Sequence, residues 1–209
     1  MPTEYFEQRE RALLGQRYEQ LYAAPQQTAE RGVTVSALRT TPEQFAQRAD
    51  FPLEPSPFCK AAFVVHQPDF KPGRHPYHHA GVFYSQEPSA SSAAPLLGVQ
   101  PGMRVLDLCA APGGKTLLLA EEMQNTGTLY SCDAAENRVQ LIRTAVERMG
   151  FTNVKTLCND ATQTNPTLPQ ADRILADVPC SGLGILAKKP DLRYKKLDPA
   201  RQAELLATQ

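Results

Sequence analysis

Residues 105–116 read Val105-Leu106-Asp107-Leu108-Cys109-Ala110-Ala111-Pro112-Gly113-Gly114-Lys115-Thr116. In this segment an apolar strand ends in an acidic residue and continues through a loop of very small residues into a helix. Gly113 and Gly114 allow a ligand to approach the backbone closely, and the first turn of the helix offers free N–H groups. The G-x-x-x-x-G-K-[ST] spacing of a phosphate-binding loop is absent. The segment therefore predicts a nucleoside site on an α/β fold, and an ordinary tight turn is the alternative.

Strands and helices alternate from this segment onward. We expect strands at 103–108, 128–132, 154–158 and 173–178, and helices at 115–123 and 136–149. Repeated β-α-β units with apolar strands form a parallel sheet with helices packed on its faces. The pattern therefore predicts a Rossmann-like α/β domain.

The residues before this region follow a different pattern, which predicts a small α+β domain at 1–85. We expect a helix at 4–23, a strand at 32–38, a helix that starts after Thr41 as its N-cap, and a strand at 61–65. Residues 86–102 connect the two regions, either as a flexible linker or as a helix that ends at Gly98. We therefore assign 86–209 to the second domain.

Composition limits the protein classes that the chain can belong to. It has 209 residues, of which 42% are hydrophobic, and a formal net charge of zero. It contains no apolar stretch of the roughly 20 residues that a membrane span needs, and no signal peptide, so we expect a cytoplasmic chain without a membrane partner. The five cysteines are widely spaced and odd in number, which favours free thiols. Cys132 and Cys158 lie within apolar strands, so we expect both in the core. The four histidines fit no zinc spacing, so we expect no metal.

Acidic residues follow the later strands. Asp133 ends the second strand, where an acid commonly meets ribose hydroxyls, Asp160 comes at the end of the third strand, and Asp177 lies in the end of the fourth. The carboxyl ends of parallel strands share one edge of a sheet, so these side chains should line one crevice. Each acid alone could equally cap a helix. Together with the glycine turn they predict a nucleoside site, and the lack of G-x-G-x-x-G favours S-adenosylmethionine over NAD.

The fourth strand lies within the segment Asp172-Arg173-Ile174-Leu175-Ala176-Asp177-Val178-Pro179-Cys180-Ser181-Gly182. This segment resembles the signature of the NOL1/NOP2/Sun family of RNA cytosine-5 methyltransferases. The Cys-Ala-Ala-Pro-Gly-Gly-Lys loop is similar to the cofactor motif of that family, and segments 84–90 and 189–194 are also similar to it. The resemblance extends from about Gly32 to the end of the chain. It implies a Rossmann-like class I S-adenosylmethionine-dependent methyltransferase fold.

The resemblance also implies roles for individual residues. The cofactor S-adenosylmethionine would contact the loop residues Cys109, Ala110, Ala111, Pro112, Gly113, Gly114 and Lys115. Asp133 would lie at its ribose and Asp160 at its adenine, Asp177 would also belong to the cofactor site, and Arg138 would support it. Asp177 and Cys180 would be the catalytic residues beside the cytosine ring. The partner would be RNA, with ribosomal RNA as the first expectation and tRNA as the second. The first domain would help to present that RNA.

The family mechanism depends on a cysteine thiolate that adds to carbon 6 of cytosine and so makes carbon 5 nucleophilic, while a carboxylate stabilises the adduct. In the family this cysteine lies in a later Thr-Cys motif, whereas the Pro-Cys cysteine assists release. The present sequence stops at Gln209 before such a motif. We therefore expect a domain with only its first four strands, its C-terminal part missing, and no turnover by the isolated chain. Cys180 is the alternative nucleophile, as in cytosine-5 DNA methyltransferases.

Further interpretations remain open. A basic stretch predicts contacts with RNA phosphates or a solvated face, and consists of Lys188, Lys189, Arg193, Lys195 and Lys196. A methyltransferase with another acceptor is a rival, although the Pro-Pro-Tyr of amine methylases is absent. A non-catalytic RNA- or cofactor-binding protein is another rival. The sequence leaves the oligomeric state open.

Overall fold

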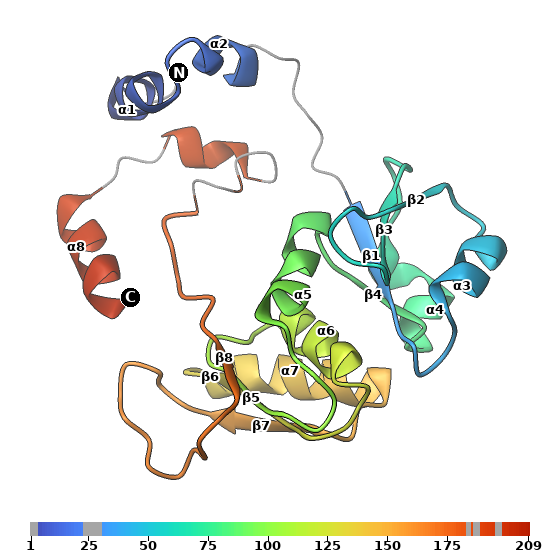
Figure 1. Ribbon diagram of the computed structural model, residues 1–209. Coiled ribbons are helices and arrows are strands. Elements are labelled where there is room, and N and C mark those ends of the chain that lie inside the picture. The colour runs from blue at the N-terminus through green and yellow to red at the C-terminus, as the bar shows by residue number, and fades with distance from the viewer. Residues whose placement is uncertain (1–3, 23–30, 183–184, 186–188, 195–197) are drawn as a thin grey trace. The chain divides into compact units, whose positions relative to one another are not determined.

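The computed structural model describes residues 4–22, 31–182, 185, 189–194 and 198–209 (Figure 1). Contacts divide the chain into two compact units. The larger unit is Glu30–Asp177, and the smaller one combines Met1–Ala29 with Val178–Gln209. Both sheets belong to the larger unit.

The larger unit contains eight strands among its described residues, together with the helices that pack on them. In chain order its elements are β1 (Arg31–Val35), α3 (Pro42–Arg48), β2 (Leu53–Pro55), β3 (Ala62–Val65), η1 (Pro72–Arg74), α4 (Pro76–His79), β4 (Phe83–Ser85), η2 (Pro88–Ser92), α5 (Ala93–Leu97), β5 (Arg104–Asp107), α6 (Gly114–Glu122), β6 (Thr128–Asp133), α7 (Glu136–Met149), β7 (Val154–Cys158) and β8 (Arg173–Leu175). The described elements of the smaller unit are α1 (Glu4–Leu14), α2 (Arg17–Tyr22), η4 (Pro190–Tyr194) and α8 (Pro199–Thr208).

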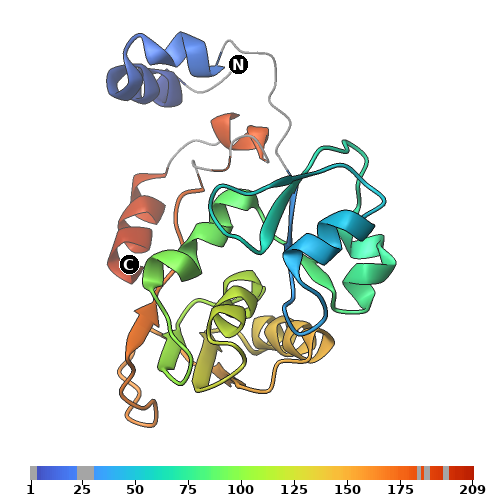
Figure 2. The same cartoon turned by 45° about the vertical axis from the view of Figure 1, so that its right-hand side comes forward.

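The second half of the larger unit is a parallel sheet with the strand order β7-β6-β5-β8. Val105, Leu129 and Val154 lie side by side on one face, because they are register partners on adjacent strands. They form one hydrophobic core with α6 and α7, whose largest buried side chains include Leu118 and Ile142 (Figures 1 and 2). This arrangement confirms the predicted Rossmann-like α/β fold.

The first half of the larger unit is an antiparallel sheet with the order β2-β3-β1-β4. One face carries an aromatic core of its own, in which Phe45 of α3 packs against Phe63 and Phe83. The opposite face contributes Ala62 and Tyr84 to the core of the parallel sheet. The small sheet is therefore buried on both faces.

Several predicted elements agree with the structure. The helix at 136–149 and the strand at 154–158 have the predicted bounds. The helix α6 differs from the prediction by one residue at each end, and β6 by one residue at its C-terminal end. Thr41 caps α3, because its side chain accepts a hydrogen bond from the Gln44 N–H. The connector contains the helix α5, which ends just before Gly98.

Three expectations were wrong. The strand predicted at 173–178 ends at Leu175, because its partner β5 ends at Asp107 and β8 has no second neighbour in the described sheet. The helix predicted at 4–23 is two helices with a turn between them. This turn brings Phe6, Tyr18 and Tyr22 into an aromatic cluster that a single straight helix would not form.

Cys158 was expected in the core together with Cys132, but only Cys132 is buried. The reason is the position of β7 at the edge of the described sheet, where most of its side chains are partly or fully exposed. All five cysteines are free thiols. Among the described helices, none has the length and apolar character needed to cross a membrane.

Candidate functional site

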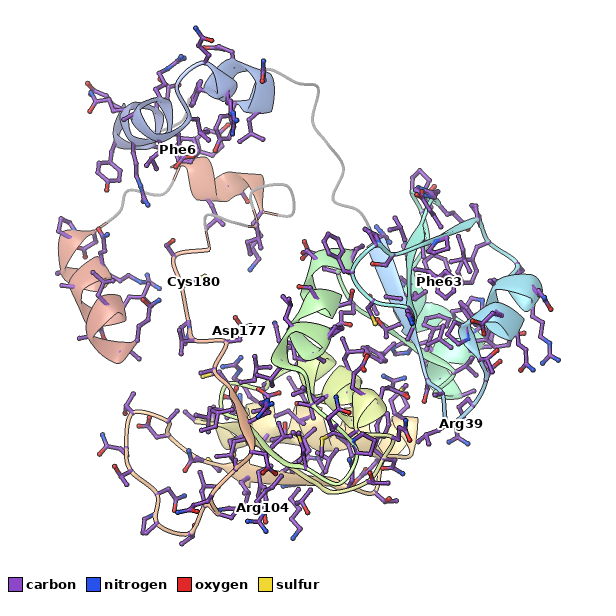
Figure 3. The ribbon with its side chains drawn as sticks, viewed as in Figure 1. Phe6, Arg39, Phe63, Arg104, Asp177 and Cys180 are labelled. Atoms are coloured by element: carbon purple, nitrogen blue, oxygen red, sulfur yellow. The ribbon has the colours of Figure 1, made fainter. Side chains whose placement is uncertain are left out.

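Four aspartates follow the carboxyl ends of the four parallel strands. Asp107 and Asp133 are the last residues of β5 and β6, whereas Asp160 and Asp177 lie two residues beyond β7 and β8. Because all four strands are parallel, these ends share one edge of the sheet. The strand order places the acids along that edge as Asp160, Asp133, Asp107 and Asp177. Figure 3 labels Asp177 at the end of β8.

The loop between β5 and α6 lies at the same edge, at the first turn of α6. The Ala110 N–H donates to the Cys132 carbonyl oxygen at 2.9 Å, which fastens the loop to β6. Gly113 then caps α6 with a φ of 109°, a conformation that L side chains rarely adopt. A Cβ at Gly114 would meet only the amide nitrogen of Gln86, at 3.6 Å. The backbone of the first turn of α6 is therefore open to a close-fitting ligand.

Asp107 is fully buried at the centre of this edge. Its Oδ2 accepts a hydrogen bond from the Thr116 hydroxyl at 2.8 Å, and Thr116 is also bonded to Ser131 at 2.7 Å. Its Oδ1 is buried and has no hydrogen-bond partner among the described residues. Burial raises the pKa of Asp107 from 3.8 to about 6, against the opposing effects of the Thr116 hydrogen bond and the Lys115 charge. Asp107 thus offers a free acceptor that would gain from a cationic ligand.

Asp133 is also buried, with only 3% of its side chain exposed. Its Oδ2 accepts the Ala111 N–H and its Oδ1 accepts the Ala135 N–H, each at 3.3 Å. Arg138 forms an ion pair with Oδ1 at 3.2 Å and donates to the Ala111 carbonyl oxygen at 3.0 Å. The carboxylate is therefore fixed from three sides. Each carboxylate oxygen can accept about two hydrogen bonds, so Oδ2 keeps capacity for a ligand hydroxyl.

Asp177 differs from these two acids because 56% of its side chain is exposed. Its Oδ2 accepts a hydrogen bond from the Lys115 ammonium at 2.6 Å. Lys115 is the second residue of α6, so this pair links the start of that helix to the segment after β8. The structure thus brings two of the predicted site residues into direct contact.

Asp160 is exposed and caps the turn that follows β7. One of its oxygens, Oδ1, accepts the Thr162 N–H at 2.9 Å and the Thr162 hydroxyl at 2.7 Å, and these bonds lower its pKa. The neighbouring Asn159 N–H donates to the carbonyl oxygen of Asp133 at 3.0 Å. Asp160 therefore lies at the shared edge through its strand, and its carboxylate hydrogen bonds are local.

The two predicted cysteines have different environments. Burial raises the pKa of the Cys109 thiol, and the nearby carboxylates Asp133, Asp107 and Asp177 raise it further. Cys109 is thus held as a thiol and is not suited to attack a base. Cys180 is exposed and belongs to the smaller unit, three residues after Asp177 closes the larger one. Its place beside the cytosine ring stays a prediction.

Sequence reasoning missed three polar residues behind this edge. These residues are Thr116, Ser131 and Gln86, and all three are buried. Thr116 is hydrogen-bonded to Ser131, and Gln86 donates to the Gly114 carbonyl oxygen at the start of α6. The available signal was weak: Ser131 alternates with apolar residues in its strand, and Thr116 lies among leucines in its helix. Three residues of the predicted basic stretch, Lys188, Lys195 and Lys196, lie outside the described residues.

The donor set fits a nucleoside that carries positive charge. The edge has four carboxylates and two cationic side chains, Lys115 and Arg138, so anionic groups predominate. The unpartnered Asp107 oxygen suits a cation, and the spare capacity of Asp133 suits a sugar hydroxyl. Within the described part of the chain, no three His, Cys, Asp or Glu side chains form a group that could hold a metal ion.

Comparison with known proteins identifies relatives of the whole chain. The family model for "16S rRNA methyltransferase RsmB/F" matches residues 94–208, and the model for the "N-terminal domain of 16S rRNA methyltransferase RsmF" matches residues 1–88. Ribosomal RNA small subunit methyltransferase F of Aliivibrio fischeri (strain MJ11) is 35% identical over 187 residues, which are 84% of this chain and 39% of the relative. The corresponding enzyme of Escherichia coli O157:H7 is 32% identical over 92% of this chain and 42% of its own length. The chain thus spans less than half the length of these relatives.

Solved structures agree with the fold. The crystal structure of PH0851 has a TM-score of 0.83 at 26% identity and covers 98% of this chain and 50% of its own. A methyltransferase homologue from Pyrococcus horikoshii has a TM-score of 0.69 at 30% identity, over 75% of this chain and 52% of its own. NSun6 from Pyrococcus horikoshii, with a TM-score of 0.80 at 17% identity, covers 99% of this chain and 78% of its own, and it shares the fold.

Proposed function

Because the chain belongs to the 16S rRNA methyltransferase RsmB/F family, as its resemblance to the NOL1/NOP2/Sun group predicted, we propose that it takes part in methylating carbon 5 of cytosine in RNA with S-adenosylmethionine as the methyl donor. The observation that carries this proposal is the carboxyl edge of the parallel sheet. There the strands bring an open helix start, two buried carboxylates and an exposed carboxylate–lysine pair to one rim.

The inner part of the rim would hold the cofactor. When bound, S-adenosylmethionine supplies an electrophilic methyl group on a sulfonium. The buried Asp107 would attract the cationic methionine part, since its Oδ1 is unpartnered. Asp133 would accept a ribose hydroxyl on Oδ2, and Asp160 would contact the adenine. The loop from Cys109 to Lys115 would approach the cofactor with its backbone.

The outer part of the rim would face the acceptor base. Asp177 is exposed and oriented by Lys115, so it can meet a cytosine ring that has left its stack. A carboxyl group near ring N3 would stabilise the adduct that a thiolate forms at carbon 6, because it can donate a proton to the negative charge that builds up on the ring. Cys180 follows Asp177 by three residues and is the second catalytic residue in this proposal.

We further propose ribosomal RNA as the substrate, with tRNA as the alternative, and a cytoplasmic location, where such RNA is found. The names of the relatives support the first choice. Residues 1–85 would present the RNA to the methyltransferase residues, 86–209. The two family models support this division, since one matches residues 1–88 and the other residues 94–208.

Titration calorimetry with S-adenosylmethionine tests the cofactor half of the proposal. We expect the wild-type chain to bind S-adenosylmethionine more tightly than NAD, because the loop lacks the G-x-G-x-x-G of NAD sites. Equal or stronger binding of NAD would contradict it.

Methyl transfer tests the other half. The chain is incubated with labelled S-adenosylmethionine and small-subunit ribosomal RNA, and the digested RNA is analysed by mass spectrometry for 5-methylcytidine. Where transfer occurs, Asp177→Asn should reduce it by about a hundredfold or more, since the ring would lose its carboxylate. Label on another base or on protein would favour a different acceptor, and robust multiple turnover would overturn the expectation that the isolated chain has no turnover.

A further inference from the structure

Gln86 joins the small antiparallel sheet to the first turn of the helix that follows the cofactor loop. Its side-chain Nε2 donates to the carbonyl oxygen of Gly114 at 3.1 Å, and its Oε1 accepts the Thr34 hydroxyl at 3.0 Å. Its backbone N–H donates to the carbonyl oxygen of Gly32 at 3.1 Å. Only 8% of Gln86 is exposed, so these bonds are shielded from water.

The direction of the amide follows from its two partners. The carbonyl oxygen of Gly114 can only accept, so the amide nitrogen of Gln86 must face it. The amide oxygen is then left for the Thr34 hydroxyl, which lies on a fully buried residue of β1. Thr34 and Gln86 are 52 residues apart, and Gln86 and Gly114 are 28 apart. The pair is thus a specific link between sequence-distant parts of the larger unit.

Gly32 allows the backbone of Gln86 to lie this close to β1. A Cβ at position 32 would collide with the carbonyl oxygen of Gln86 and approach the Pro88 side chain to 3.1 Å. Because backbone cannot yield as a flexible side chain can, residue 32 has to be glycine. The glycine at position 32 therefore lets the backbone of Gln86 pack directly against β1, which fixes the position of Gln86.

We propose that Gln86 is a positioning residue for the cofactor loop. It holds the first turn of α6, and with it the preceding loop, in the geometry that binds the nucleoside. The inference rests on the proposed function, because it assigns the loop to S-adenosylmethionine. Sites of this kind need their backbone groups held to within a fraction of an ångström, so a loosened helix start should lower affinity.

The same interface supplies a matched control. Glu121 lies in the last turn of α6, and its Oε2 accepts the Ala37 N–H at 3.1 Å. This contact also ties α6 to the small-sheet region, but it lies seven residues from Gly114, or about 10 Å along the helix. Glu121→Ala should loosen the interface without touching the loop.

The test compares Gln86→Leu, Gln86→Glu and Glu121→Ala in the full chain, by calorimetry with S-adenosylmethionine, by thermal unfolding, and by hydrogen exchange of residues 109–118 without ligand. We expect both Gln86 variants to weaken binding about tenfold, or about 1.4 kcal/mol, and to speed exchange in that segment. Gln86→Glu keeps the side-chain size and the acceptor for Thr34 but sets a carboxylate oxygen against the Gly114 carbonyl oxygen, whereas Gln86→Leu removes both hydrogen bonds without adding a charge. Glu121→Ala should lower the unfolding temperature while leaving affinity and exchange unchanged.

The proposal is overturned if the Gln86 variants bind as tightly as the wild type, or if Glu121→Ala weakens binding equally at the same loss of stability. If the wild-type chain binds no S-adenosylmethionine, the proposed function fails and exchange alone decides on Gln86. Faster exchange in the Gln86 variants would then still support a positioning role, and unchanged exchange would exclude it.

Discussion

The inner strands of the parallel sheet end in aspartates, and each outer strand is followed two residues later by an aspartate, but the environments of these four residues differ. Asp107 and Asp133, on the central strands, are buried and bonded to the loop, to α6 or to the start of α7. Asp160 and Asp177, after the edge strands, are exposed and bonded to one residue each through their carboxylates. The inner acids are buried and held by hydrogen bonds from several elements of the fold, whereas the outer acids are exposed at its surface.

This difference separates two tasks. A buried carboxylate with fixed donors is pre-organised and changes little when a ligand arrives, which suits cofactor binding. An exposed carboxylate held by one lysine can meet a large, variable partner such as an RNA base. Substitutions at the four positions should therefore differ in how far they affect stability, and the expected effects decrease from Asp133 to Asp160.

Asp133→Ala should have the largest effect. It leaves the N–H groups of Ala111 and Ala135 without their acceptor and Arg138 without its partner, so the free energy of unfolding should fall by about 3 kcal/mol. Affinity for S-adenosylmethionine should fall at least tenfold. Chemical denaturation and calorimetry measure both. Glu136→Ala is the control. Glu136 begins α7, the helix that contains Arg138, but its side chain is 66% exposed.

A stability of Asp133→Ala within 0.5 kcal/mol of the control, a margin typical of exposed sites, would remove the distinction between inner and outer acids.

Asp107→Asn should have the next largest effect, and it should depend on pH. Folding raises the pKa of Asp107 from 3.8 to about 6, so between these values the folded chain binds more protons than the unfolded one. Wild-type stability therefore falls as pH rises through this window, and the loss is complete above about pH 6. Asparagine has no such charge. The stability of Asp107→Asn relative to the wild type should rise with pH by up to about 3 kcal/mol, since each pKa unit is worth about 1.4 kcal/mol.

Unfolding curves from pH 4 to 8 measure this difference, and cofactor affinity is measured in parallel. Affinity should fall, because the asparagine carries no charge to attract a cation. A flat difference curve would show that Asp107 does not carry a buried charge.

The sequence alone predicted the inner acids better than their surroundings. A run of apolar residues that stops at Asp133 marks both a strand and its carboxyl end, because a parallel strand is buried over its whole length. The polar groups behind these acids form hydrogen bonds with distant parts of the chain: Ser131 bonds Thr116 across 15 residues, and Gln86 bonds Gly114 across 28. Such contacts depend on how helices pack on the sheet, which no local pattern encodes.

The edges of the sheet explain two of the three wrong predictions. An apolar pattern predicts a strand, but its length depends on the neighbouring strand, so β8 ended with β5. The same pattern predicted a buried Cys158, although an edge strand leaves such residues partly exposed. Local sequence thus determines the type of an element more reliably than its environment.

Asp177→Asn should change stability only slightly. The Lys115–Asp177 pair is partly exposed, and such pairs contribute about 0.5 kcal/mol or less after solvent screening. Affinity for S-adenosylmethionine should change by no more than about threefold, because the proposed role of Asp177 concerns the base. Denaturation and calorimetry in the same buffer test this, with Lys115→Met as the companion that removes the other partner. A loss of stability as large as that of Asp133→Ala would show that Asp177 stabilises the fold as the inner acids do.

Asp160→Asn should have the smallest effect, and its pH dependence should have the opposite sign to that of Asp107→Asn. The Thr162 hydrogen bonds lower the pKa of Asp160 below its ordinary value of 3.8. Its charge therefore stabilises the folded state above about pH 4, and this contribution disappears as pH falls through the lowered pKa. Relative to the wild type, the variant should be slightly less stable at neutral pH and equal to it in acid. Acid unfolding monitored from pH 2 to 6 measures the trend, and a difference that grows as the pH is lowered would show that Asp160 is not held by these bonds.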